Sequence, residues 1–372
     1  MGFNVEQPDF EADRLVSNDD DLRRLKIVPY RDDGGVDRGI EFIERLHKTR
    51  GTLTNKTTPR AFEIVYGENG NDEISFYWLP LDDSDLSWLQ KQLENRYPDS
   101  NVSVRSPDFL GIEDGDYVAG GHFGLVRHRF YPIRRRDTED FREDDPYESI
   151  LGDIVDAGDT QHIAGRPGRG RGRVRSIAQI MIRPRKKNWT TTSWRNIRKD
   201  WRMIYGDMTG LDSLADEFSG RGGGMNNAVA EALRKRAREP SFDVSVRFLS
   251  ACDDPNAVYD HVQHFADSFS EYYNGFAEQG FSLDAASDPG CLAEDMAGRV
   301  WKDDQAIPLS SVEVGGLAHN PLANMGVDEI TFSTTKDAGS APTDAEQFDV
   351  SQVGAAPAIG QDDADTEDGE SA

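Results

Sequence analysis

The sequence has few cysteines, few lysines and no long hydrophobic run. Its two cysteines, Cys252 and Cys291, are too few for a disulfide framework in a chain of 372 residues. No window approaches the roughly 18 uninterrupted apolar residues of a membrane span. The N-terminal residues are acidic, whereas a secretory signal begins with a basic and then an apolar run. We therefore expect a cytoplasmic protein, and docking on a membrane complex through a partner remains compatible with the sequence.

Complete catalytic motifs are also missing from the sequence. There is no G-x-x-x-x-G-K-[ST] phosphate loop and no G-x-S-x-G nucleophile elbow. The Gly-rich stretch 166–173 precedes an expected strand, whereas a phosphate loop joins a strand to the start of a helix. The stretch 219–227 precedes an expected helix and has amides suited to an anion, but we favour a flexible linker as its explanation. We expect no enzymatic activity and no cofactor, and an enzyme with an unrecognised site is the alternative.

Four residues raise the question of a metal site. His261 and His264 lie three apart on an expected helix, with Cys252 before them and Cys291 after them. Two Cys and two His can surround zinc, but strong zinc signatures contain paired C-x-x-C knuckles, and none occurs here. A partly buried helix face accounts for the same residues, so we expect no metal.

Charge is the most unusual property of the chain. The formal net charge is −26, and only ten of the 42 basic residues are Lys. Such a chain repels itself at low salt and stays solvated where salt screens the charges. We interpret the composition as adaptation to a salt-rich cytoplasm. An ordinary acidic protein with a disordered tail is the alternative.

A basic island interrupts this acidity between Arg166 and Arg202. It holds thirteen Lys or Arg and one acid, Asp200, and tryptophans are interleaved with the cations. Cations neutralise phosphates and Trp stacks on bases or Arg, so the island suits nucleic acid, but an acidic protein surface or plain solvation remain open. The candidate binding residues are Arg169, Arg171, Arg173, Arg185, Lys186, Lys187, Trp189, Trp194, Arg195, Arg198 and Arg202.

Hydrophobic patterns predict an α+β protein with two ferredoxin-like units. Helices are expected at 37–48, 83–96, 193–206, 225–238, 255–275 and 289–301, with another that begins at Asp145 and Pro146. Strands are expected at 61–66, 74–79, 101–105, 124–134, 174–184, 242–251 and 281–286. The expected divisions are a polar arm (1–36), a first unit (37–160), an Arg/Gly-rich linker (161–173), a second unit (174–330) and a disordered acidic tail (331–372).

The order of several segments resembles a known family. The succession FEIVYGENGNDEISFYWLP, LQKQLENRYPDSNV, FYPIRRRDTEDFREDDPYESILGDI and RSIAQIMIRPRKKNW is similar to the non-ATPase N-terminal region of type IV secretion (conjugative DNA transfer) ATPases. The likeness is to HerA/FtsK-superfamily versions carried by haloarchaeal plasmids and proviruses. VEVGGLAHNPLANM at 312–325 lies where that family has a short Gly-Leu-His element before its motor domain. The motor itself has no counterpart after residue 330, so the family's ATPase activity does not carry over.

The resemblance implies a non-catalytic accessory or assembly module of a mobile-element DNA transfer or translocation system. Its expected partners are a translocase ATPase or membrane transfer complex, DNA, and further copies of the same chain. A structural or scaffold protein of a halophilic virus or provirus is the alternative from a different class.

Overall fold

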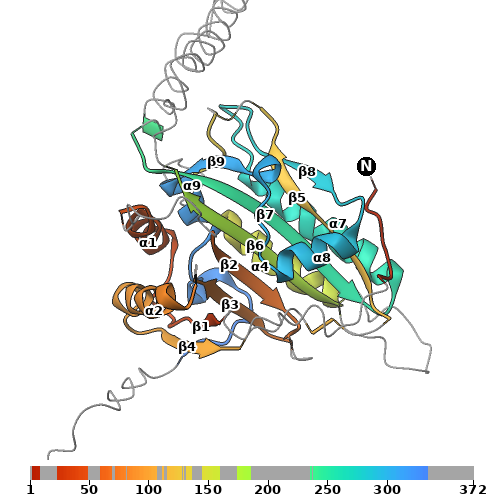
Figure 1. The fold of residues 1–372 in the computed structure, drawn as a ribbon, viewed down its shortest axis with the longest axis horizontal. Helices are drawn as coiled ribbons and strands as arrows, with labels where there is room; N and C mark the ends of the chain where they lie inside the picture. Colours follow the sequence, from red (N-terminus) through yellow and green to blue (C-terminus); the bar gives the residue numbers. More distant parts are fainter. Residues whose placement is uncertain are drawn as a thin grey trace, which may run out of the picture. The chain divides into compact units, whose positions relative to one another are not determined.

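Nine strands form one antiparallel sheet in the computed structural model (Figure 1). The strand order is β4-β1-β3-β2-β6-β7-β5-β8, and β9 pairs with β7. The structure describes residues 2–8, 23–48, 59–68, 72–80, 82–106, 111–112, 115–127, 129, 131–135, 145–159, 174–185, 235–236 and 238–333.

The first repeat has the order βαββαβ, with its strands arranged β4-β1-β3-β2. This is the ferredoxin-like arrangement. Its elements are β1 (Arg24–Val28), α1 (Val36–Lys48), β2 (Arg60–Tyr66), β3 (Ile74–Leu79), α2 (Asp83–Arg96) and β4 (Asn101–Arg105). Helix α2 begins after Asp82, whose carboxylate accepts a hydrogen bond from the Asp85 amide at 2.9 Å and so caps the first turn.

The second repeat has the same connectivity and the equivalent strand order, β8-β5-β7-β6. Its elements are β5 (Tyr117–Leu125), α4 (Pro146–Asp159), β6 (Arg175–Pro184), β7 (Ser241–Cys252), α7 (Pro255–Ser268) with the 3-10 turn η4 (Phe269–Tyr272), and β8 (Phe281–Ala285). The α+β class and the two ferredoxin-like units are therefore confirmed.

An Asp-Pro pair begins three helices, namely α4, α7 and α8 (Pro289–Ala297). Asp254 accepts from the Asn256 amide and Asp288 from the Cys291 amide, at 2.9 and 2.7 Å. Asp145 does the same for the Tyr147 amide at 3.0 Å. The carboxylate accepts from a backbone N–H that the first turn of the helix leaves unpaired, and proline has no backbone N–H that would need a partner.

The two repeats fuse through their equivalent edge strands, β2 and β6, which pair antiparallel over the length of β2. One face of the sheet packs against α1, α2, α4, α7 and α9 (Ser311–Leu317) and forms the larger hydrophobic core. The other face carries a smaller core closed by α8. In Figure 1, α8 crosses in front of the sheet and α4 lies behind it.

A C-terminal strap ties the repeats together after β8. It runs through α8, the 3-10 turn η5 (Asp303–Gln305), β9 (Ile307–Ser310), α9 and the 3-10 turn η6 (Ala323–Met325). Its last described residues return to the first repeat, where the Ser333 amide donates to Pro29 O at 2.8 Å. The strap therefore begins beside the second repeat and ends beside the first.

Strand pairing divides the chain differently from the expected boundaries. Strand β1 lies inside the expected polar arm, and β5 and α4 belong to the second repeat, although residues 37–160 were assigned to the first. The strand expected at 124–134 lies earlier, at Tyr117–Leu125, and the helix expected at 255–275 ends at Ser268. The expected linker, most of the helices at 193–206 and 225–238, and nearly all of the tail lie outside the described residues.

Candidate functional site

The β6–β7 connection enters and leaves the sheet at a single point. Strands β6 and β7 pair to their ends, where Pro184 faces Phe242, and the Arg185 amide donates to Ser241 O at 3.0 Å. This connection carries most of the basic island. Of the candidate binding residues only Arg185 is described; Arg169, Arg171, Arg173, Lys186, Lys187, Trp189, Trp194, Arg195, Arg198 and Arg202 lie outside the described residues.

Arg185 and its neighbour Arg183 bind acids of the same chain. Arg185 Nε lies 3.3 Å from Asp243 Oδ1, and Arg183 contacts Asp243 at 3.5 Å and Asp303 at 2.8 Å. The Arg183 guanidinium also lies 4.3 Å over the Trp301 ring. A hydrogen bond from Trp301 and the nearby Arg183 lower the pKa of Asp303. The anionic partner of Arg185 is thus a carboxylate of the same chain.

The two halves of the island join opposite ends of β6. Arg175, at the start of the strand, pairs with Asp116 and donates to Gly111 O. The strand is 10 residues long, so Arg175 and Arg185 are separated by roughly 30 Å. Residues 166–173 and 186–202 are therefore attached to the sheet at two distant points.

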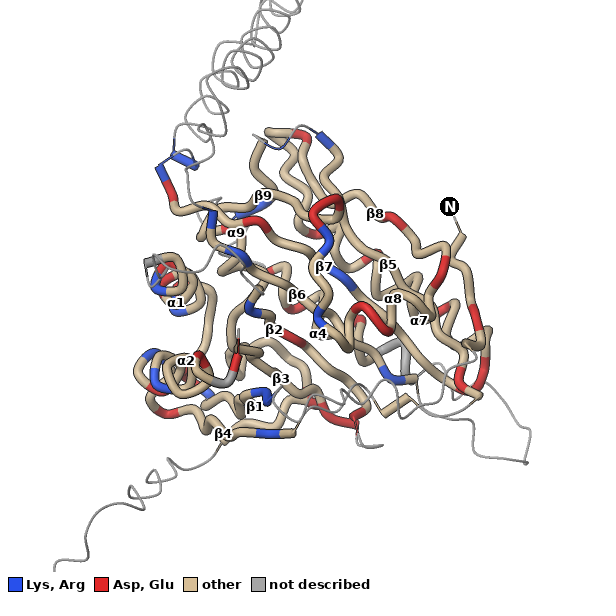
Figure 2. The backbone as a smooth tube through the Cα atoms, in the orientation of Figure 1, with Lys and Arg blue, Asp and Glu red and all other residues tan. Residues whose placement is uncertain are grey.

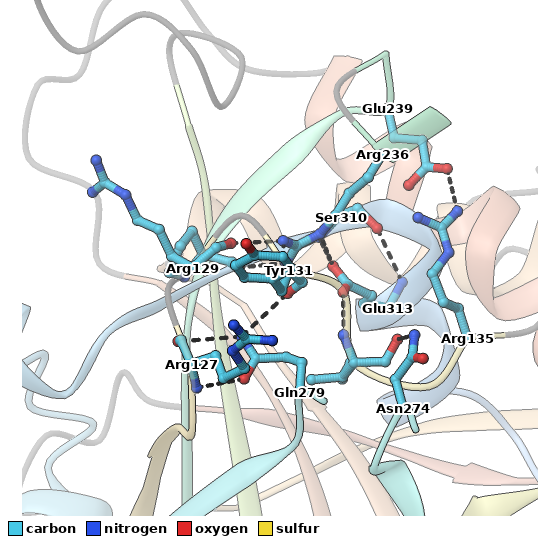
Figure 3. A network of polar contacts seen from close by, with 12 residues as sticks. Arg127, Arg129, Tyr131, Arg135, Arg236, Glu239, Asn274, Gln279, Ser310 and Glu313 are labelled. Atoms are coloured by element: carbon cyan, nitrogen blue, oxygen red, sulfur yellow. Dashed lines mark hydrogen bonds and ion pairs between the residues drawn. The ribbon is translucent and has the colours of Figure 1, made fainter. Parts of the chain in front are cut away.

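Arg236 is buried near the end of the β6–β7 connection, where it acts as a clamp between three segments of the chain (Figure 3). Its Nε donates to Glu313 at 2.9 Å, and its terminal nitrogens donate to the carbonyls of Arg129, Tyr131 and Pro308 at 2.6 to 3.1 Å. Burial lowers the pKa of Arg236, while Glu313 opposes this shift. One side chain thus fixes the segment after β5, the segment before β7 and the strap.

Glu313 is the acceptor at the centre of this clamp. Its Oε2 also accepts from the Ser310 amide at 2.7 Å and its Oε1 from the Ile133 amide at 3.0 Å. With Ser310 Oγ accepting from the Glu313 amide, this forms a capping box at the start of α9. The S-x-x-E pattern of this capping box is visible in the sequence, whereas the partnership of Glu313 with Arg236 has no sequence signal.

A second ion pair supports the same region. Arg135 pairs with Glu239, and both side chains are largely buried. Burial raises the pKa of Glu239, and Arg135 counteracts this effect. The pair attaches the residues just before β7 to the segment that follows β5.

The strap meets both repeats at the GGLAHNP segment. Helices α9 and α1 approach so closely that a Cβ on Gly315 would lie 2.5 Å from Ile40 Cγ1, and one on Gly39 would lie 2.5 Å from His319 Cβ. His319 packs against Tyr147 of α4 with ring centroids 4.2 Å apart and ring planes tilted by 40°, and its Nε2 lies 3.4 Å from Asp145. The segment is therefore wedged between a helix of each repeat.

A polar row joins the repeats on the opposite face of the sheet. Gln179 of β6 lies directly across from Glu63 of β2 and Arg247 of β7. Its amide nitrogen donates to Glu63 at 2.7 Å, and its oxygen accepts from Arg247 at 2.5 Å. Burial lowers the pKa of Arg247 to about 10. Gln179 is the glutamine of the RSIAQIMIRP segment on which the resemblance partly rests.

The four residues considered for zinc do not gather. Cys252 and His261 are buried, and His261 Nε2 contacts Ser176 Oγ, whereas Cys291 is exposed. Within the described ranges no group of three His, Cys, Asp or Glu is placed to hold a metal ion. The same part of the chain contains no helix long and apolar enough to cross a membrane.

The fold and these contacts define an α+β protein of two fused ferredoxin-like repeats, held by internal clamps and a C-terminal strap. The chain belongs to a family described as "Domain of unknown function (DUF8128)", which matches residues 6–331. That match spans both repeats and nearly all of the strap. No curated protein matches the chain.

Proposed function

We propose that the chain is a non-catalytic assembly module of a DNA transfer or translocation system, working from the cytoplasm beside a translocase ATPase. Supporting this is the resemblance of its segments to the N-terminal region of conjugative transfer ATPases. The family match assigns no activity, so the proposal rests on that resemblance and on how the chain is built.

The position of the GGLAHNP segment is the observation that carries the proposal. In the resembling ATPases the chain continues from this element into the motor. Here the element is wedged between α1 and α4, and its approach to α1 leaves no room for a Cβ at Gly39 or Gly315. On this proposal, a force applied at this segment would pass to both repeats, as a platform for a motor requires.

Direct contact with DNA is a separate part of the proposal. Arg175, Arg183 and Arg185 pair with Asp116, Asp243 and Asp303, so these members of the island already have anionic partners. Figure 2 shows basic and acidic residues interspersed along the described elements. Contact with phosphates would fall to the other cations of the island.

Purified protein mixed with the translocase ATPase encoded nearest its gene tests the proposal. We expect the two to form a complex in size-exclusion chromatography, and we expect the chain alone to hydrolyse no ATP. Arg238→Met, a substitution at an exposed residue near Arg236, should leave the complex intact and serves as the control. Failure to bind the ATPase would contradict the proposal. So would ATP hydrolysis by the chain alone, if a substitution in the chain abolishes that hydrolysis.

A further inference from the structure

Exposed apolar side chains gather at one loop of the second repeat. Val126, Tyr273 and Phe276 are 56 %, 50 % and 61 % exposed, and they make up half of the six large apolar side chains that the described residues expose. Val126 and Tyr273 are neighbours, because the Val126 amide donates to Gly280 O at 3.1 Å and Gly280 lies against the Tyr273 ring. Phe276 belongs to the same loop, between Asn274 and Gln279, whose backbones pair. We call Val126 and residues 273–280 the aromatic loop.

The backbone of the aromatic loop is held rigidly. Asn274 and Gln279 exchange two backbone hydrogen bonds, and Asn274 Oδ1 accepts from the amides of Phe276 and Ala277, each at 3.1 Å. The Gln279 side chain in turn binds the backbone of Arg127 and Tyr131 (Figure 3). Phe276 is thus exposed to solvent on a loop whose backbone these hydrogen bonds hold in place. Pre-ordering of this kind lowers the entropy cost of binding a partner.

Two ion pairs border the aromatic loop. Arg127 pairs with Glu278 at 3.1 Å and Arg134 with Glu271 at 3.5 Å, with Glu278 68 % and Glu271 47 % exposed at the side chain. In a chain of net charge −26, these four side chains add no net charge to the loop. They therefore add nothing to the repulsion between two copies that meet there.

A contact about a two-fold axis places the same surface on both partners, so that surface must be complementary to itself. An apolar centre flanked by a partly exposed cation, Arg127, and an exposed anion, Glu278, meets this requirement. We propose that the aromatic loop is the surface through which two copies of the chain associate, with Arg127 of each copy facing Glu278 of the other. This inference does not rest on the proposed function.

Salt dependence follows from the same charges. The net charge of each copy opposes association at low ionic strength, and molar salt screens that repulsion. Salting-out ions also strengthen apolar contacts. Dimerisation should therefore become tighter as potassium phosphate rises to molar concentration, opposite to the behaviour of a contact held by unlike net charges.

Sedimentation equilibrium across a protein concentration series in molar potassium phosphate tests the surface. The wild type should dimerise, and Phe276→Ser should raise the dissociation constant about tenfold or more, as loss of a central aromatic contact does. The matched control is Val300→Ser, at a valine that is 43 % exposed outside the loop. A wild type that stays monomeric, or a dimer that Phe276→Ser leaves unchanged, would overturn the proposal.

A charge exchange tests the two-fold pairing itself. Arg127→Glu alone and Glu278→Arg alone should each dimerise more weakly than the wild type, because like charges then face each other. An equal mixture of the two variants should form heterodimers in preference to either homodimer, because both facing pairs then have opposite signs. Within each variant, residues 127 and 278 carry like charges whether the chain is in a homodimer or a heterodimer. This repulsion within the chain therefore cancels from the comparison of the two kinds of dimer. A statistical mixture of dimers would refute the pairing.

Discussion

At the scale of single residues, arginine serves this chain as an internal connector. Arg24 with Glu68, Arg60 with Asp85, Arg175 with Asp116 and Arg236 with Glu313 all lie largely buried. A guanidinium offers five donors in a fixed planar arrangement and suits such pairs better than an ammonium. The scarcity of Lys thus has a structural reason in addition to the salt adaptation that the composition suggests.

Replacing Arg236 with Met should destabilise the fold strongly. Breaking a buried ion pair from one side leaves an uncompensated charge, here Glu313, and costs about 3–5 kcal/mol. Adding Glu313→Gln removes that charge and keeps the side-chain oxygen that caps α9, so the double variant should recover part of the loss. Urea unfolding followed by circular dichroism measures these free energies of unfolding.

Arg238→Met is the control for this comparison, since Arg238 is exposed two residues away. A surface change of this kind should stay within about 0.5 kcal/mol of the wild type. Equal unfolding free energies for Arg236→Met and Arg238→Met would show that the clamp does not stabilise the fold.

At the scale of elements, the contact between α1 and α9 decides how the strap is seated. Gly39→Ala would place a methyl group 2.5 Å from His319 Cβ. Overpacking of this kind costs about 1–3 kcal/mol, more than the ~0.5–1 kcal/mol that Ala gains over Gly within a helix. The midpoint of thermal unfolding should therefore fall.

Gly152 of α4 offers the matched comparison, because nothing outside its adjoining residues and the backbone of its own helix lies within 4 Å of the position its Cβ would take. Gly152→Ala should leave stability unchanged or raise it by about 0.5–1 kcal/mol. A fall of equal size in both variants would mean that the close approach of α1 and α9 is not what makes Gly39→Ala costly.

The sequence predicted those elements whose side chains carry a clear period. The hairpin of β2 and β3, helix α2 and strands β6 and β7 lie close to their expected ranges. Strand β5 was expected at 124–134 instead of its observed position because Gly120, Gly121 and Gly124 interrupt the hydrophobic alternation that marks a strand. Its neighbours need at least two of these glycines, since a Cβ at Gly120 would lie 2.3 Å from Phe248 O and one at Gly121 2.6 Å from Asp284 O. Short apolar runs such as β1 and β9 gave too little signal.

The clamps were beyond sequence reasoning for a different reason. Arg236 and Glu313 are 77 residues apart, and neither is distinguishable by pattern from the other charged residues of an acidic chain. The basic island was visible as composition. The strand expected at 174–184 already lay between the two halves of the island, but that this strand pairs with β2 and β7 at the centre of the sheet is revealed only by the fold.

At the scale of the whole molecule, the two repeats share one sheet, the polar row and the strap join them, and the basic connection links two central strands. On the function proposed above, such a platform would hold other components together. A platform of this kind should be required for the process that it supports without being required for copying the element's DNA.

Deleting the gene from its native element and counting transfer to recipient cells tests this central claim most directly. We expect transfer to fall sharply while the copy number of the element stays unchanged. Wild-type protein and Arg238→Met should restore transfer, whereas Arg236→Met should restore less in proportion to the folded protein that remains. Undiminished transfer, or a loss confined to the release of virus particles, would contradict the account.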